Sequence, residues 1–170
     1  AFEAWYIPFP PERDQCFRML EILRPFFENE AIVKIGQNLK YDIQVLMQYG
    51  IAVKGILFDT MIAHYLIQPE LKHSMDYLSE VYLNYTPVHI EELIGKKGKG
   101  QLNMRDVETG IICEYAAEDA DVTWQLAEIF KPELDKQRLA YLASQIEIPL
   151  IQVLADKERT GIRLNTNEIK

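Results

Sequence analysis

Two short strings in the sequence constrain this chain more strongly than its overall composition does. The first, residues 36–42, reads Gly-Gln-Asn-Leu-Lys-Tyr-Asp and directly follows a β-branched apolar run. The second, residues 114–121, reads Glu-Tyr-Ala-Ala-Glu-Asp-Ala-Asp and lies inside the longest helical pattern of the domain. Each string places a tyrosine and a carboxylate on a predicted helix beside an apolar segment of the core. The two strings are therefore the candidate functional site.

Short apolar runs alternate with helical patterns along most of the chain. Strands are predicted at residues 4–7, 31–36 and 55–58, and helices at 15–28, 38–49, 59–67, 74–84 and 106–130. We expect Asn38 and either Asp59 or Thr60 to cap the second and third of these helices. This alternation favours an α/β domain. Such a sheet usually has about five or six strands, and the first predicted strand begins close to Ala1, so we expect the first strands to be missing.

The character of the sequence changes after Pro132. Residues 137–159 read as one long helix that is interrupted at Pro149 and stopped by Gly161, and residues 162–164 read as the start of a strand. We therefore divide the chain into a first domain at 1–136 and the opening of a second domain at 137–170.

Composition sets further bounds on the function. The net charge of −8 is the wrong sign for bulk phosphate neutralisation, although carboxylates that hold divalent cations remain compatible with a nuclease. No apolar run approaches the roughly 20 residues that cross a bilayer, so we expect no membrane partner. Cys16 and Cys113 lack metal-ligand spacing and are expected to be buried free thiols, which fits a reducing cytoplasm.

The spacing of the acidic side chains gives the two strings a chemical meaning. Tyr115 and Asp119 are four residues apart and share one helix face. A carboxylate there can hold Mg²⁺ or Mn²⁺, and the phenol can orient a metal-bound water. Asn38 and Asp42 are also four apart, at the carboxyl edge where α/β sites form. From these residues alone, a solvated acidic face and plain helix capping stay open as alternatives.

The order of the motifs resembles a known family. Residues 34–42 closely resemble the second exonuclease motif of bacterial family A DNA polymerases, and the segments 58–61, 75–78 and 115–123 resemble later segments of the same domain. The tail at 148–162 is similar to the start of the polymerase domain, so the resemblance covers nearly the whole chain. Tyr115 marks the Tyr subclass of the Asp-Glu-Asp-Asp exonucleases. The implied fold is ribonuclease H-like, with three layers and a mixed sheet flanked by helices.

The resemblance also implies roles for individual residues. Asp119 would bind the tighter of two Mg²⁺ or Mn²⁺ ions, Asp42 would serve the second, and Tyr115 would position the attacking water. Other side chains would touch a single-stranded 3' end: Gln37, Asn38, Tyr41, Lys72, His73 and Met104. Lys72 and His73 fall at phosphate-contacting positions, and Met104 falls where the family commonly has an aromatic wedge. The product would be a deoxynucleoside monophosphate.

One departure from the family pattern limits what we expect of this chain. The first motif, an Asp-x-Glu pair on an early strand, has no match near Ala1, where residues 1–6 instead resemble the third strand. We therefore expect this piece to be inactive by itself, although the longer polymerase that contains it would be active. The alternatives are a vestigial domain that only supports the polymerase and a ribonuclease D-like exoribonuclease.

Two further surfaces are open to partners. The glycine-rich loop at 95–100 carries Lys96, Lys97 and Lys99, and these lysines either reach a DNA backbone or form a solvated loop. A sheet that lacks its first strands would expose an edge, through which two copies could associate. The polymerase domain of the same longer chain is the expected intramolecular partner.

Overall fold

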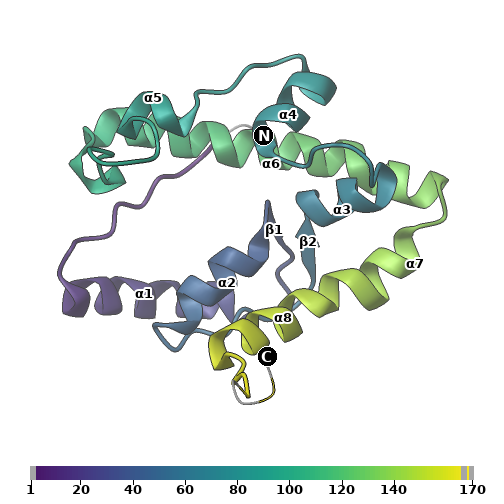
Figure 1. Cartoon of the computed structure of the whole chain (residues 1–170), viewed down its shortest axis with the longest axis horizontal. Helices are drawn as coiled ribbons and strands as arrows, with labels where there is room; N and C mark the ends of the chain where they lie inside the picture. Colours follow the sequence, from purple (N-terminus) through teal and green to yellow (C-terminus); the bar gives the residue numbers. More distant parts are fainter. Residues whose placement is uncertain (1–2, 166–167, 169–170) are drawn as a thin grey trace.

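The computed structural model describes residues 3–165 and residue 168 (Figure 1). The described part is mostly helical and has a small parallel sheet at its centre. The elements follow in the order α1 (Arg13–Phe27), β1 (Lys34–Gly36), α2 (Leu39–Met47), β2 (Leu57–Asp59), α3 (Thr60–Ile67), α4 (Met75–Leu78), the π-helical turn η1 (Ser79–Leu83), α5 (Ile90–Ile94), the 3-10 turn η2 (Met104–Asp106), α6 (Thr109–Lys136), α7 (Ala140–Leu142), the π-helical turn η3 (Ala143–Glu147) and α8 (Ile148–Thr160). The predicted α/β class is confirmed.

The sheet places the ends of β1 and β2 side by side. The two strands are parallel, and the register pairs Lys34 with Leu57 and Gly36 with Asp59. Helix α6 packs against β1 and helix α8 packs against β2, so the pair lies between these two long helices (Figure 1). Because parallel strands carry their following helices at the same edge, α2 and α3 both begin where β1 and β2 end.

Two predicted strands are not strands. Residues 4–7 have no regular structure, and neither do residues 162–164. Both segments have the apolar composition of strands, but in the described part of the chain only β1 and β2 pair. A strand needs a neighbouring strand to pair with its backbone N–H and C=O groups. Apolar composition alone therefore did not predict these two segments correctly.

The long helix α6 begins and ends later than its pattern predicts. Its predicted start at Asp106 is taken by η2, where the Asp106 side chain accepts a hydrogen bond from the Asn103 backbone N–H at 3.1 Å. The helix then continues through Pro132 to Lys136. Its first turns bury only a narrow stripe that includes Ile112 and leaves Cys113 exposed, so the expectation of a buried thiol is confirmed for Cys16 and wrong for Cys113.

The C-terminal helical segment packs into the same core as the sheet helices. Ile148, Ile151 and Ala155 lie in one buried cluster with Leu39 and Ile43 of α2. Helix α8 is entered through the π-helical turn η3, and Pro149 stands in its first turn, where a missing N–H is tolerated. The division into two domains at residue 137 stays a prediction. None of the helices in the described residues is both long and apolar enough to cross a membrane.

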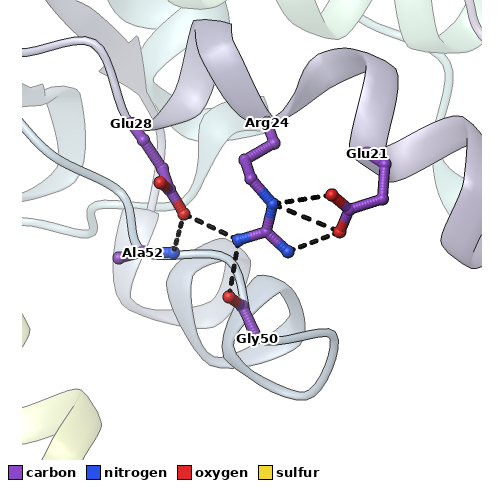
Figure 2. A network of polar contacts seen from close by, with 5 residues as sticks. All are labelled: Glu21, Arg24, Glu28, Gly50 and Ala52. Carbon is purple, nitrogen blue, oxygen red and sulfur yellow. Dashed lines mark hydrogen bonds and ion pairs between the residues drawn. The ribbon is translucent and has the colours of Figure 1, made fainter.

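A guanidinium group fastens α1 to the turn that follows α2. Arg24 donates to both Glu21 and Glu28, and its Nη1 also donates to the Gly50 carbonyl at 2.8 Å (Figure 2). The Glu28 carboxylate in turn accepts from the Ala52 backbone N–H at 3.3 Å. That backbone bond, followed by Arg24, lowers the pKa of Glu28. The network sets the position of α1 along one flank of α2.

Among the described residues, Phe130 is the largest side chain that is completely buried, and it packs against the rings of His64 and Tyr82. We expect Phe130→Ala to destabilise the chain by about 3–5 kcal/mol, because the cavity cannot refill. Urea denaturation followed by circular dichroism measures this loss. Ile111→Ala on the exposed face of the same helix is the matched control, with an expected change within about 0.5 kcal/mol. Equal losses in the two variants would contradict this view of the core.

Candidate active site

Asp59 holds the start of both helices that follow the sheet. Its side chain is 1% exposed, and its Oδ1 accepts from the backbone N–H groups of Met61 at 2.9 Å and Ile62 at 3.3 Å, which caps α3 as expected. The same carboxylate also reaches across the register to α2, accepting from Asn38 N–H at 3.1 Å and from Leu39 N–H at 2.7 Å. One buried carboxylate thus satisfies four backbone donors.

The expectation that the Asn38 side chain caps α2 is wrong. Asn38 lies in the left-handed region with φ of 60°, and its side chain makes no capping hydrogen bond. Asparagine tolerates this conformation better than most residues, and the cap comes from Asp59 instead. A Cβ atom at Gly36 would lie 2.3 Å from the Leu39 side chain, so a larger residue there would displace that side chain. Residues 36–39 therefore turn directly from strand to helix.

Gln37 is a brace between three segments. Its side-chain oxygen accepts from the Thr60 hydroxyl, and its Nε2 donates to the His73 carbonyl at 2.8 Å. Both ends of the amide are therefore engaged within the chain. The predicted contact between Gln37 and a nucleotide stays a prediction, and the structure adds a structural role that sequence reasoning missed.

The two strings meet at one cleft of about 670 Å³. Residues 36 and 37, Tyr41 and Asp42 line it from the β1–α2 side, and Asp119 lines it from α6. Its walls are largely apolar and include Phe26, Ile43, Met75, Ala120 and Trp124. Tyr41 is 65% exposed, so its ring stands free at the cleft. The structure thus brings together Gln37, Tyr41, Asp42 and Asp119 from the predicted site.

Burial alters the protonation of the two carboxylates in the cleft. It raises the pKa of Asp119 to about 6; the hydrogen bond from Tyr115 opposes this shift, while Glu118 and Asp76 add to it. Burial also raises the pKa of Tyr115 to about 12, with Asp119 as the next cause, so Tyr115 keeps its proton at neutral pH. The pKa of Asp42 is raised mainly by burial, and the charge of Asp59 adds to this. Burial therefore destabilises the charged form of both carboxylates.

Four predicted contact residues are not among those that line this cleft: Asn38, Lys72, His73 and Met104. The predicted catalytic Tyr115 is not among the lining residues either. Lys72 is exposed in the segment before α4. The His73 ring packs on His64, with 2.7 Å between their Nδ1 atoms. Met104 begins η2, ahead of α6. His64 itself is completely buried and also contacts the Tyr82 hydroxyl through Nε2; burial lowers its pKa to about 4. It is therefore a packed, neutral histidine of the core.

Acidic neighbours that sequence reasoning left out surround Asp119. Glu118 accepts hydrogen bonds from the Tyr85 hydroxyl and from the Val88 backbone N–H at 2.9 Å, and Asp76 accepts from His89 at 2.9 Å. These bonds dock residues 85–89 onto α6 and α4. Among the described residues, no group of three or more acidic, histidine or cysteine side chains is close enough together to hold a metal ion. Asp42 and Asp119 thus supply two carboxylates, which are oxygen ligands of the kind that Mg²⁺ prefers.

The fold also matches part of a solved structure. The structure matches 88% of this chain to 23% of the "POL domain of Pol1 from M. smegmatis complex with DNA primer-template and dNTP", with a TM-score of 0.70 at 20% identity. Residues 4–135 match the family model described as 3'-5' exonuclease. The chain belongs to this exonuclease family, which confirms the family predicted from the motifs.

Curated relatives narrow the family further. The chain is 35% identical to DNA polymerase I of Pseudomonas aeruginosa over 97% of its length, 34% identical to that of Borreliella burgdorferi over 99%, and 37% identical to that of Rhizobium leguminosarum over 91%. These matches cover 19%, 18% and 15% of the three relatives. The chain therefore spans about a fifth or less of the polymerases that it resembles.

Asp59→Ala removes the acceptor of four backbone donors at the candidate site. We expect it to destabilise the chain by about 2–4 kcal/mol, because each lost cap costs roughly 1 kcal/mol or more and the donors are buried. Hydrogen exchange at the start of α2 should rise with it. Ser74→Ala is the matched control, since Ser74 precedes α4 without a side-chain capping bond. A loss no larger than that of Ser74→Ala would contradict the double cap.

The raised pKa of Asp119 predicts a pH-dependent gain from Asp119→Asn. Between about pH 4 and pH 6 the folded chain binds a proton that the unfolded chain has released, so stability falls as the pH rises through this window. The variant escapes this loss and should melt roughly 2–4 °C higher at pH 7.5, with little difference near pH 4. Calorimetric melting at both pH values measures this. Asp121→Asn, on the exposed side of α6, should leave the melting temperature unchanged at both pH values. A gain for Asp119→Asn that is equal at both pH values would contradict a destabilising buried charge at Asp119.

Proposed function

We propose that this chain is part of the 3'-5' proofreading exonuclease domain of a DNA polymerase. The domain would hydrolyse the 3'-terminal phosphodiester of single-stranded DNA and release a deoxynucleoside monophosphate. One observation carries the proposal: Asp42 and Asp119 come from strings more than seventy residues apart in the sequence, and both line one cleft. The ribonuclease H-like fold and the division into 1–136 and 137–170 belong to the same proposal.

The residues of the cleft fit divalent metal chemistry in kind. Mg²⁺ is commonly held by one or two carboxylates together with waters and substrate phosphates, and Asp119 and Asp42 supply two. Bound Mg²⁺ or Mn²⁺ would polarise the phosphodiester and make a water nucleophilic near neutral pH. Two carboxylates leave most of an octahedral shell to water and substrate. We therefore propose that this chain alone holds the ions weakly and cleaves poorly or not at all.

The other side chains would bind and orient the 3' end. Tyr115 keeps its proton and is hydrogen-bonded to Asp119, so it can hold a water beside that carboxylate without acting as a base. The exposed ring of Tyr41 offers a stacking surface for a terminal base, and Asn38 stands beside it at the start of α2. Lys72 and His73 lie in the segment before α4, and we propose that they contact a phosphate group of the strand. Met104 would act as a wedge between bases.

Binding of the product tests this function separately from turnover. A Mn²⁺ titration by calorimetry, in the presence of a deoxynucleoside monophosphate, should show that metal and nucleotide strengthen each other's binding. Asp119→Ala should weaken Mn²⁺ binding by about tenfold or more, and Asp121→Ala should leave it unchanged.

The outcomes separate the proposal from its rivals. Nucleotide-dependent Mn²⁺ binding that survives Asp119→Ala would place the metal elsewhere. No binding in the unaltered chain would favour a vestigial supporting domain. A preference for ribonucleotides would favour a ribonuclease D-like enzyme. A 3'-labelled single strand, assayed in parallel, reports cleavage; fast cleavage would support the exonuclease and contradict weak metal binding.

A further inference from the structure

The loop at 95–100, which we call the basic loop, is a closed turn that presents three lysines. Lys96, Lys97 and Lys99 are all exposed. The neck of the loop is held by a hydrogen bond from Leu102 N–H to the Ile94 carbonyl at 2.9 Å, and by one from Gln101 Nε2 to the Gly95 carbonyl at 3.2 Å. The turn is thus fixed at its base, and the lysines project from its tip.

The charge of the basic loop contrasts with that of the chain. The net charge is −8, yet three of four consecutive positions in the loop are lysine. The ion pairs found in the described residues use other cations: Arg24, Lys40, His89, Lys131 and Lys136. Glu91 and Glu92 lie in the first turn of α5, one helix length before the loop. The lysines therefore form a local positive surface.

Two points on α6 bound the segment that carries the basic loop. The Val88 N–H bond to Glu118 anchors the chain beside Asp119, and the chain returns to α6 at Thr109. The basic loop lies within this excursion, which joins α5 to the N-terminal end of α6 (Figure 1). Thr109 and Asp119 are ten residues apart in one helix, which is about 15 Å at a 1.5 Å rise. That separation matches about four nucleotides of a stacked strand.

We propose that the basic loop binds the phosphate backbone of the single strand about four nucleotides from its 3' end. This inference rests on the proposed exonuclease function and adds a second contact to it. Lysine ammonium groups serve phosphate as mobile point charges, and such contacts position a strand without reading its sequence. The cleft holds the terminal nucleotide, and the basic loop holds the strand behind it.

Salt-dependent binding of fluorescent oligonucleotides tests the basic loop. We compare the unaltered chain with the triple variant Lys96→Gln, Lys97→Gln, Lys99→Gln, using single strands of about four and about twelve nucleotides. For the longer strand, the slope of log K against log salt should become shallower by about 2, because each single-strand phosphate contact contributes roughly 0.7. Its affinity should fall about tenfold or more at low salt. The shorter strand should bind both proteins about equally.

A charge-matched variant separates a local contact from bulk charge. Lys54→Gln, Lys136→Gln, Lys157→Gln removes the same three charges from exposed positions elsewhere, and it should leave the slope unchanged. An equal salt slope for the basic-loop variant and the unaltered chain would overturn the inference. So would a loss of affinity in the control variant as large as that in the basic-loop variant. A loss of affinity for the short strand as large as that for the long strand would overturn it too. If the unaltered chain binds Mn²⁺ and nucleotide, and the basic-loop variant binds the longer strand with unchanged affinity and salt slope, only this inference is overturned. If the unaltered chain binds neither strand, the proposed function falls with it.

Discussion

The carboxylate of Asp59 is the interaction on which the geometry of the site depends. Two short parallel strands give little surface on which to fix the helices that follow them. Asp59 compensates by accepting one pair of backbone N–H groups from each helix. Burial raises the pKa of Asp59 and the four N–H bonds lower it, so the buried group is acceptable only while its donors stay in place. The position of Asp42, one turn further along α2, follows from this cap.

The partly buried carboxylates of the cleft destabilise the fold, and packing elsewhere offsets this loss. Asp119 and Asp42 are both partly desolvated, and acidic neighbours add to the penalty at each. Packing around Phe130 and the shared core with α8 hold α6 and α2 in place regardless. A site that concentrates uncompensated negative charge is suited to bind a cation, because the cation removes the penalty that folding has left. The same buried carboxylates therefore destabilise the free chain and suit the cleft for the proposed cation.

The sequence predicted local features well and the contacts between distant segments poorly. Helix patterns and the two strings predict Asp42, Tyr115 and Asp119 as site residues, because period and spacing are visible in a single chain. The structure places Asp42 and Asp119 in the lining of one cleft. The second role of Asp59 depends on the parallel register with Gly36, which no local pattern reveals. Gln37 likewise finds its partners at Thr60 and His73. Residues 4–7 failed as a strand for the same reason, since a strand is defined by its partner.

The amide of Gln37 joins the end of β1 to two later segments of the chain. The Gln37 amide donates to the His73 carbonyl and accepts from the Thr60 hydroxyl, which leaves one N–H and one oxygen lone pair for other partners. Within the chain, its effect is to hold the segment before α4 against the end of β1. Lys72 and His73 lie in that segment, so their proposed contact with phosphate depends on this brace. The contacts with DNA that we propose for this acidic chain are therefore few and local: the cleft with its two carboxylates, the segment before α4 and the basic loop.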